Sequence, residues 1–398
     1  MAKYAKCVFS SELPYEKDQV VTLFLKDNFK QVDSFIMSLG QMTNIPPNRL
    51  RTYKDGKLVN EQVYAKNNLN KGGLPLYFYY IPKSLLIVVR DHLRALKSIN
   101  FICDIFFAQH FLPAYIAVVL RKLGILKCSK IIFWMFDFFP IPPEVTRSIY
   151  YRGTDVMQRY LRKHVDEIWY STHRLKEVDK NRFGALNKDV KSKITDGLFF
   201  RKIKTKSSSG KIPPLKLAFL GSIRRNNAIY ESVDAVKYCV DAGMKVELHV
   251  IGSGPEDKIL KNYVRKYKIG KAIKFYGFED RGEKIASIFS KCHFGMALYP
   301  ADPYSANWYL TSGKFRRFIS QGLPVITSTI PYFSKYINDY KAGYVVDNDP
   351  QEVYKVLKKV YDKPVTLNKL RRGVNILYEK YYADKILDEA FADTLKDE

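Results

Sequence analysis

Short apolar runs alternate with segments of helical periodicity along the whole chain. In residues 1–200, five such runs have the length and apolar content of strands: Lys6–Phe9, Ser34–Met37, Ile105–Phe107, Lys130–Met135 and Glu167–Tyr170. Helical patterns lie between several of them. This alternation is typical of βαβ units, in which helices cover both faces of a parallel sheet.

The alternation is more regular from residue 215 onward. We expect strands at Leu215–Leu220, Lys245–Ile251, Lys274–Tyr276, His293–Leu298 and Pro324–Thr327. We expect helices at Tyr230–Ala242, Glu256–Tyr267, Lys284–Lys291, Gly313–Ser320 and Pro350–Tyr361, followed by a long C-terminal helical region.

A polar, charged stretch separates the two series. Residues 201–214 read RKIKTKSSSGKIPP, which is typical of a linker. We therefore expect an N-terminal Rossmann-like domain over residues 1–200, a linker over 201–214, a second Rossmann-like domain over 215–375 and a C-terminal helix over 376–398. Two doubly wound α/β domains in tandem place a ligand in the cleft between them, at the carboxyl ends of the strands.

One apolar segment is long enough to span a bilayer. Ser98–Leu120 has 23 residues, but Asp104, His110 and Pro113 interrupt it. The segment therefore favours a buried strand over Cys103–Ala108, a loop, and a helix that begins near Pro113.

Charge and cysteine content narrow the functional classes. Lys and Arg total 66 against 40 Asp and Glu, which gives a net charge of +26 spread over both halves of the chain. This excess favours anionic partners such as nucleotides, nucleic acid or acidic lipid headgroups. The five cysteines stand singly, without zinc-ligand spacing, and the N-terminus lacks a signal peptide's apolar stretch. We expect a protein of a reducing compartment without a metal site.

Three predicted strands end in glycine-containing turns. Gly221 precedes Arg224 in AFLGSIRRNN, Gly252 lies in HVIGSGPE, and Gly277 precedes Phe278 in FYGFED. A glycine lets a ligand approach the backbone, and an arginine can bind a diphosphate with a fork of donors. Each turn taken alone is equally typical of an ordinary strand-to-helix connection.

The segment TSGKFRRFISQGLPVITS is more specific. Ser312 and Gly313 stand where a helix is predicted to begin, and the free N–H groups there suit phosphate. Lys314 lies in the first turn, where a cation opposes the helix dipole. A bound anion would offset that conflict, and a solvated lysine is the alternative.

Together these elements resemble the family 4 (group 1) glycosyltransferases and their relatives with the GT-B fold. The resemblance covers roughly residues 215–361 and rests on LGSIRRNN, VIGSGPE, IKFYGFED, FGMALYP, and SGKFRRFISQGLPVITS followed by KAGYVVDND. Many such enzymes read P-x-K-x-x-E-Y-L-A-x-G-x-P-V-I at the longest of these segments. In the N-terminal half, SKIIFWMFDFFP, DIFFAQHFLPA and ITDGLF resemble further family motifs more weakly. The resemblance implies two Rossmann-like domains facing across a cleft, with the C-terminal helix returning to the N-terminal domain.

The resemblance also implies an activity. Such an enzyme moves a sugar from a UDP- or GDP-linked donor to a glycan or lipid-linked acceptor, in surface polysaccharide or glycolipid assembly. The residues that would hold the diphosphate are Gly221, Arg224, Ser312, Gly313 and Lys314. Gly277 and Phe278 would present backbone to the base, and Gly252 and Gly254 would shape the turn beside it. We expect neither metal nor other cofactor, because cationic side chains and a helix N-terminus supply the positive charge.

The sequence departs from the family at its acidic and basic catalytic positions. Arg317 stands where the second family glutamate is expected, and near the first only Asp302 is acidic. The family histidine is Phe136 here, which leaves Asp137, at a predicted strand end, as the candidate general base. His110 is the competing candidate. A structural aspartate that caps the next turn and a histidine packed in the core are the alternatives.

A basic amphipathic segment lies in the N-terminal half. Residues 83–97 read KSLLIVVRDHLRALK and place Leu85, Leu86, Val89, Leu93 and Leu96 on one side of a helix, and Lys83, Arg90, Arg94 and Lys97 on another. This pattern indicates contact with an anionic membrane surface, although a helix packed on the core explains it almost as well. We expect a cytoplasmic protein that is peripheral on the inner face of the cell membrane.

Other functional classes remain open. A nucleotide-sugar epimerase has a similar two-domain shape but needs several acid and base groups around one sugar. A non-catalytic partner in glycan assembly would explain the missing acidic pair. A nucleic-acid binder is not expected, because no recognition motif appears and the positive charge is not clustered.

Overall fold

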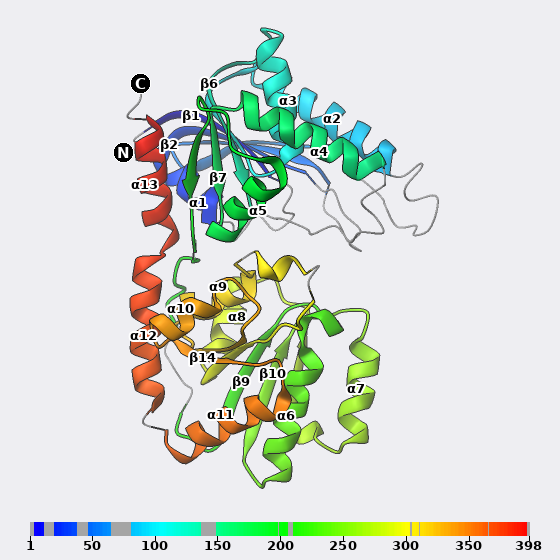
Figure 1. Cartoon of the computed structure of the whole chain (residues 1–398), viewed down its shortest axis with the longest axis vertical. Coiled ribbons are helices and arrows are strands. Elements are labelled where there is room, and N and C mark those ends of the chain that lie inside the picture. The colour runs from blue at the N-terminus through cyan, green and yellow to red at the C-terminus, as the bar shows by residue number, and fades with distance from the viewer. Residues whose placement is uncertain are drawn as a thin grey trace. The chain divides into compact units, whose positions relative to one another are not determined.

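The computed structural model of this chain describes residues 4–11, 20–37, 47–64, 81–136, 149–197, 199–205, 210–302, 305–309, 311–364 and 366–395, without the side chains of 4, 81–85 and 149–151. The chain forms two compact units, which Figure 1 shows. Unit 1 comprises Met1–Asp196 and Leu387–Glu398, and unit 2 comprises Gly197–Ile386. Each unit is built around its own sheet.

Unit 1 contains an eight-stranded sheet in the order β4-β3-β2-β1-β5-β6-β7-β8. The strands are β1 (Tyr4–Ser11), β2 (Phe29–Ile36), β3 (Arg49–Lys54), β4 (Lys57–Val63), β5 (Ile102–Ala108), β6 (Lys127–Met135), β7 (Glu167–Tyr170) and β8 (Lys191–Ile194). Pairing is parallel from β2 through β1 to β8 and antiparallel where β3 meets β2 and β4. The direction in which successive strands are added reverses after β4, so that β5 lies on the other side of β1, as in doubly wound sheets.

Among the described residues of unit 1, six helices accompany this sheet. They are α1 (Val20–Asn28), α2 (Ile81–Ser98), α3 (Phe111–Lys122), α4 (Ile149–His164), α5 (His173–Phe183) and α13 (Ala383–Leu395). The connections α3, α4 and α5 all advance in the same direction across the sheet, so right-handed crossovers place them on one face, opposite α1. The prediction for Ser98–Leu120, a strand followed by a helix, is confirmed by β5 and α3. In the described part of the chain, no helix is long and apolar enough to cross a bilayer.

The hairpin β3–β4 is an element that the apolar runs do not predict. Every residue of β4 is exposed or half-buried, so the strand lacks the apolar alternation that marks a buried one. Asp55 and Gly56 connect the two strands with φ of 47° and 75°. Such a turn requires positive φ at both residues, and Asp-Gly is among the pairs that adopt it most readily.

The last helix, α13, returns to unit 1, as predicted. Phe391 is fully buried there, with its ring centroid 4.8 Å from that of Trp169 and 5.5 Å from that of Phe107. It also contacts Phe24 of α1 and Phe29 of β2. The C-terminal helix therefore supplies part of the core of the N-terminal unit.

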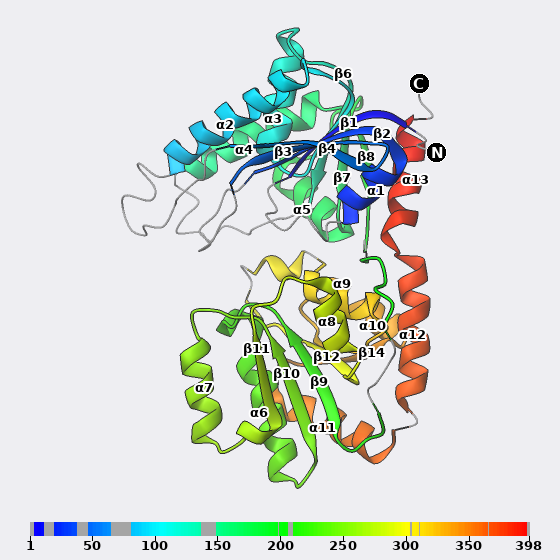
Figure 2. The ribbon, with the colours of Figure 1, turned by 180° about the vertical axis from the view of Figure 1, so that it is seen from behind.

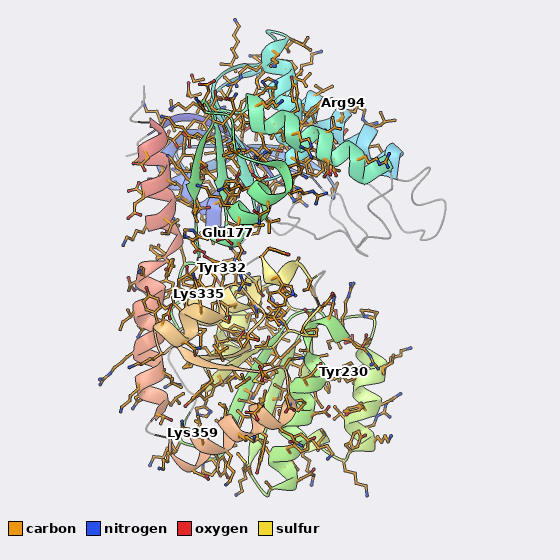
Figure 3. All side chains as sticks on the ribbon, viewed as in Figure 1. Arg94, Glu177, Tyr230, Tyr332, Lys335 and Lys359 are labelled. Atoms are coloured by element: carbon orange, nitrogen blue, oxygen red, sulfur yellow. The ribbon has the colours of Figure 1, made fainter. Side chains whose placement is uncertain are left out.

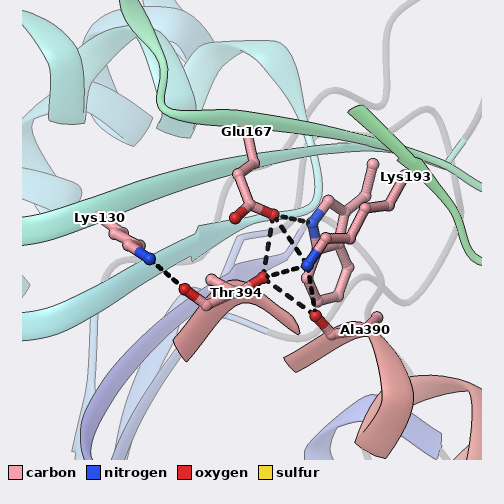
Figure 4. A network of polar contacts seen from close by, with 6 residues as sticks. Lys130, Glu167, Lys193, Ala390 and Thr394 are labelled. Carbon is pink, nitrogen blue, oxygen red and sulfur yellow. Dashed lines mark hydrogen bonds and ion pairs between the residues drawn. The ribbon is translucent and has the colours of Figure 1, made fainter. Parts of the chain in front are cut away.

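Polar contacts hold the end of α13 to the same sheet (Figure 4). Lys193 Nζ donates to the carbonyl of Ala390 at 2.7 Å and to Thr394 Oγ1 at 2.8 Å, and Lys130 Nζ donates to the carbonyl of Thr394. The buried carboxylate of Glu167 accepts from Thr394 Oγ1 at 2.9 Å. Lys130 thus binds a carbonyl in the last turn of α13, where backbone acceptors lack internal partners and the helix dipole favours cations.

Unit 2 contains a six-stranded parallel sheet in the order β11-β10-β9-β12-β13-β14, which is the strand order of the Rossmann fold. The strands are β9 (Leu215–Leu220), β10 (Val246–Ile251), β11 (Ile273–Gly277), β12 (Phe294–Ala297), β13 (Val325–Ser328) and β14 (Gly343–Val346). The helices are α6 (Ile229–Asp241), α7 (Asp257–Lys266), α8 (Gly282–Phe289), α9 (Gly313–Ser320), α10 (Ser334–Asp339), α11 (Pro350–Asp362) and α12 (Thr366–Lys380). Three single-turn 3₁₀ helices are η3 (Arg225–Asn227), η4 (Gly270–Ala272) and η5 (Ala306–Trp308).

Both faces of this second sheet are buried. Leu217 and Phe219 of β9 pack in one core with α6, α7 and α11, while Ala218 packs in another with α8, α9 and α10. Figure 2 shows the two groups of helices on opposite faces of the strands. The near-continuous apolar sequence of these strands follows from burial on both faces. The strand order reverses between β9 and β12, and ligands of such sheets bind at the carboxyl ends beside this point.

Candidate functional site

The predicted glycine turns lie together at the carboxyl ends of three neighbouring strands in unit 2. Gly221 N–H donates to the carbonyl of Ile251 at 3.0 Å, and Gly252 N–H donates to the carbonyl of Gly277 at 2.7 Å. A further bond joins Ile223 N–H to the carbonyl of Ser253 at 3.2 Å. Backbone hydrogen bonds therefore join the ends of β9, β10 and β11 to one another.

Glycine is required where two of these turns meet. Gly252 has a φ of 142°, and a Cβ there would lie 1.9 Å from the carbonyl oxygen of Gly221. A Cβ on Gly254 would lie 2.4 Å from the carbonyl oxygen of Ile223. Atoms cannot approach so closely, so any larger residue would separate β9 from β10. The motif GSGP thus reflects close packing of backbone beside the candidate site.

Helix α9 begins next to the same strand ends. Its N-cap residue, Ser312, makes no side-chain hydrogen bond to the helix; its hydroxyl instead accepts a hydrogen bond from Tyr299. Gly313 is exposed, and a Cβ there would meet open space. The first turn of α9 therefore presents N–H groups that the usual serine cap does not satisfy.

Lys314 connects α9 to the end of β9. Its side chain is 8% exposed and passes over two aromatic rings, with Nζ 4.3 Å from the Tyr299 centroid and 5.0 Å from the Phe219 centroid. Nζ also lies 3.4 Å from the carbonyl oxygen of Asn227, just beyond β9. Among the described residues, no carboxylate pairs with Lys314. Burial without a counter-charge lowers the pKa of this ammonium from its usual 10.5 to about 7.

Tyr299 positions both Ser312 and Lys314. The tyrosine is buried just after β12, its N–H donates to Ser328 Oγ at 3.0 Å, and its carbonyl accepts from the same hydroxyl at 2.9 Å. Burial also raises the pKa of the Tyr299 phenol, so this group stays neutral. Sequence reasoning missed Tyr299, although FGMALYP was recognised as a motif, because its contacts depend on the packing of β12 against α9.

The remaining predicted binding residues lie around the strand ends. Arg224 is exposed and immediately precedes η3, three residues before Asn227. The Asn227 side chain donates to the carbonyl of Ser222 at 2.7 Å, which fixes the turn that carries Arg224. Phe278 follows Gly277 and is 61% exposed, an unusual setting for a large apolar ring. The structure thus brings all of the predicted binding residues to the side of unit 2 where the carboxyl ends of its strands lie.

The positions of the missing family glutamates hold other groups. Arg317 on α9 has its guanidinium 4.7 Å from the ring centroid of Phe200. Asp302 is exposed, and its backbone carbonyl accepts from the Trp308 indole at 2.7 Å. In the described ranges, no three His, Cys, Asp or Glu residues are arranged to hold a metal ion.

The two candidate bases belong to unit 1. His110 is the half-buried N-cap residue of α3, after β5, and its side chain does not cap the helix. The neighbouring Gln109 is buried and accepts from Ser11 Oγ at 2.5 Å, which joins the ends of β1 and β5. Asp137 lies outside the described residues, directly after Phe136. Both assignments stay predictions.

Comparison with known proteins agrees with this fold. Residues 214–363 match the family model of the group 1 glycosyl transferases. The structure of sucrose-phosphate synthase from Thermosynechococcus elongatus is similar, with a TM-score of 0.65, 12% identity, and 99% of this chain and 100% of that chain covered. The chain has the fold of the group 1 glycosyltransferases. The predicted resemblance, and the prediction of two Rossmann-like domains, are confirmed.

Two further structures with this glycosyltransferase fold contain a nucleotide. HepE of Anabaena in complex with UDP has a TM-score of 0.63 at 11% identity, with 100% of both chains covered. The pneumococcal O-GlcNAc transferase GtfA, in complex with UDP and GlcNAc, has a TM-score of 0.59 at 16% identity, with 92% of this chain and 69% of that chain covered. No curated protein matches this chain in sequence.

Proposed function

We propose that this protein transfers a sugar from a nucleotide diphosphate sugar, UDP-linked, to a glycan or lipid-linked acceptor. The observation that carries the proposal is Lys314, a buried lysine at the N-terminus of α9 that pairs with no carboxylate of the described residues. Such a position is unfavourable unless an anion occupies the site, because burial and the helix dipole both oppose the charge. A diphosphate supplies that anion.

The charge that develops during transfer falls on the leaving diphosphate. Lys314 and the N–H groups of Gly313 and its neighbours would stabilise this charge from one side, and Arg224 would do so from the β9 turn. Such stabilisation acts most strongly where water is excluded, as at the aromatic surroundings of Lys314. Protein cations would therefore supply the charge that a metal supplies in other transferases, so the activity is expected without added divalent ions.

The uridine moiety would lie against Gly277 and Phe278. Backbone groups at the β11 end can hydrogen-bond a base edge, and the exposed Phe278 ring can pack on its flat face. The UDP complexes of HepE and GtfA support uridine over guanosine. We place the acceptor in surface polysaccharide or glycolipid assembly, which the positive charge of the chain favours when the acceptor is acidic or carried on an acidic membrane.

The donor site is tested by binding and by product formation. Lys314→Ala is expected to lower turnover by roughly 10²-fold and to weaken UDP binding, because an interaction with the leaving charge is lost. Lys258→Ala, an exposed lysine on α7, serves as the matched control and should leave both unchanged. Titration calorimetry with UDP and GDP, and an assay for released nucleotide, measure the two effects. Unchanged kinetics in both Lys314→Ala and Arg224→Ala would show that the diphosphate lies elsewhere.

The assay for released nucleotide also distinguishes a glycosyltransferase from an epimerase and from a non-catalytic partner. Nucleotide released only when an acceptor is present supports glycosyl transfer. Interconversion of two nucleotide-sugars without nucleotide release would instead show an epimerase. Tight UDP-sugar binding without turnover, on any acceptor tried, would identify a non-catalytic partner.

A further inference from the structure

Helix α2 exposes leucines that its own unit does not use. Leu86 is 72% exposed and Leu93 is 36% exposed, and with Arg90 and Lys97 they recur at the spacing of one helix face. The sequence predicted these leucines on one side together with Leu96, apart from the basic residues. The structure instead buries Leu96 and leaves Leu86 and Leu93 beside the basic side chains. Lys83 and Leu85 lie in the part of α2 whose side chains are not described.

The opposite side of α2 is unusually polar for a buried face. Asp91 is fully buried, accepts from Asn48 Nδ2 at 3.1 Å and pairs with Arg90 at 2.9 Å. His92 is 1% exposed, with its ring 4.9 Å from that of Phe35, and burial lowers the pKa of this imidazole to about 3. The helix is thus held to the sheet partly by specific polar contacts. The outward leucines, Leu86 and Leu93, do not contribute to that packing, so they can contact a lipid or another protein.

Helix α4 carries a similar outward face. Arg152, Val156, Arg159 and Lys163 are exposed at the same spacing, and Val156 is 66% exposed. The one acidic residue within this stretch of α4, Asp155, pairs with Arg182 at 2.7 Å. Both helices therefore present apolar and basic side chains together, with their carboxylates already neutralised.

Helix α4 contacts α3 near the end of α3. Figures 1 and 2 show α2, α3 and α4 as neighbouring helices of unit 1, and Figure 3 labels Arg94 on α2. Tyr160 of α4 contacts Tyr115 of α3, and Lys122 Nζ lies 5.0 Å from the Tyr160 centroid. Leu123 follows, 66% exposed. Burial, and next to it the positive charges of Lys122 and Lys163, lower the pKa of the nearby His164.

We propose that this outward face of α2 and α4, with the end of α3, binds the surface of an anionic lipid bilayer. Lysine and arginine would contact the headgroups while Leu86, Leu93 and Leu123 enter the boundary with the acyl chains. Leucines interleaved with basic residues on a helix are typical of interfacial helices, and the sequence carries no nucleic-acid recognition motif. The proposal does not depend on the donor site, which belongs to unit 2.

Vesicle sedimentation tests the proposal with the full chain. We expect binding to phosphatidylcholine vesicles containing about a third phosphatidylglycerol, little binding to pure phosphatidylcholine, and loss of binding as salt rises from about 0.05 M to about 0.5 M. Arg94→Glu/Lys97→Glu and Leu86→Ser/Leu93→Ser should each weaken binding at least about tenfold. All four positions are exposed, so both variants should melt at the temperature of the unchanged protein.

Matched variants in unit 2 provide the control. Lys258→Glu/Lys261→Glu on α7 makes the same change in net charge at exposed positions and should keep most of the binding. Equal losses in the α2 and α7 charge variants would show that net charge alone drives binding and would overturn the assignment to this face. Equal binding to neutral and anionic vesicles, or no binding to either, would also overturn it. Self-association that the leucine variant abolishes, without vesicle binding, would make the face a protein interface instead.

Discussion

Lys314 shows how one buried cation links ligand binding to pH. With a pKa of about 7 in the folded chain and 10.5 in the unfolded one, the unfolded state holds a proton that the folded state lacks between these values. The free energy of unfolding of the ligand-free protein should therefore rise as pH increases from about 7 to 10.5. Below pH 7 the folded protein is destabilised by the full cost of burying the charged Lys314 side chain. An anion at the first turn of α9 reverses this preference, because it stabilises the charged form.

Donor affinity should consequently depend on pH in one direction. Binding of a UDP-sugar, whose diphosphate keeps its charge, requires Lys314 to be protonated. The dissociation constant should then rise as pH increases above about 7, by up to about tenfold per unit. Calorimetry at several pH values, in buffers of different ionisation enthalpy, should reveal proton uptake in the same range. Lys314→Arg, which stays charged, should flatten the profile, and a flat profile in the unchanged protein would contradict the assignment.

The residue that acts as general base can be identified by substituting Asp137 and His110. Asp137 follows Trp134 and Phe136 and precedes two further phenylalanines in the sequence, and a carboxylate there could take the proton of the acceptor hydroxyl as general base. We expect Asp137→Asn to lower the maximal rate by about 10²–10⁴-fold, far more than His110→Gln, with nucleotide affinity nearly unchanged. Steady-state kinetics and UDP titration on each variant measure this. An active Asp137→Asn with an inactive His110→Gln would reverse the roles, and normal rates in both would place the base elsewhere or on the leaving phosphate.

At the scale of elements, the sequence was most informative where apolar content and turn residues coincide. The bounds of β9 and α9 were predicted to the residue, since each is apolar or periodic and begins or ends at glycine. The hairpin β3–β4 was missed because its outer strand is polar, although Asp55-Gly56 was the available signal. Lys314 could be singled out because its position opposes a local dipole. Tyr299 could not, because its contacts with Ser312 and Lys314 arise only when distant segments pack together.

The return of α13 to unit 1 gives a prediction at this scale. Phe391→Ala removes a fully buried ring that contacts four aromatic side chains, so we expect unit 1 to lose about 3–5 kcal/mol of stability. Glu389→Ala, at an exposed position of the same helix, should change stability by less than about 0.5 kcal/mol. Denaturant unfolding followed by tryptophan fluorescence can report this, because Trp134 and Trp169 both lie in unit 1. A similar, small effect of both substitutions would mean that α13 is only loosely attached.

At the scale of the whole molecule, the two units differ in how the chain builds them. Unit 2 is one continuous segment, whereas unit 1 needs both Met1–Asp196 and the residues from Leu387 onward. The linker expected over 201–214 falls within unit 2 in this division. The proposed activities divide in the same way, with the donor site in unit 2 and the membrane-binding face in unit 1.

The placement of Phe391 has a consequence for biosynthesis. The ribosome makes the sheet of unit 1 first, yet the ring that covers Phe107 and Trp169 emerges only after all of unit 2. At about 5–20 residues per second, the intervening segment takes on the order of 10–40 s to synthesise. During that interval the nascent N-terminal sheet exposes an aromatic surface to chaperones and to aggregation. Every residue of unit 2 has been made by Ile386, before Phe391 is added, so the part of the protein that is made first is the last to be finished.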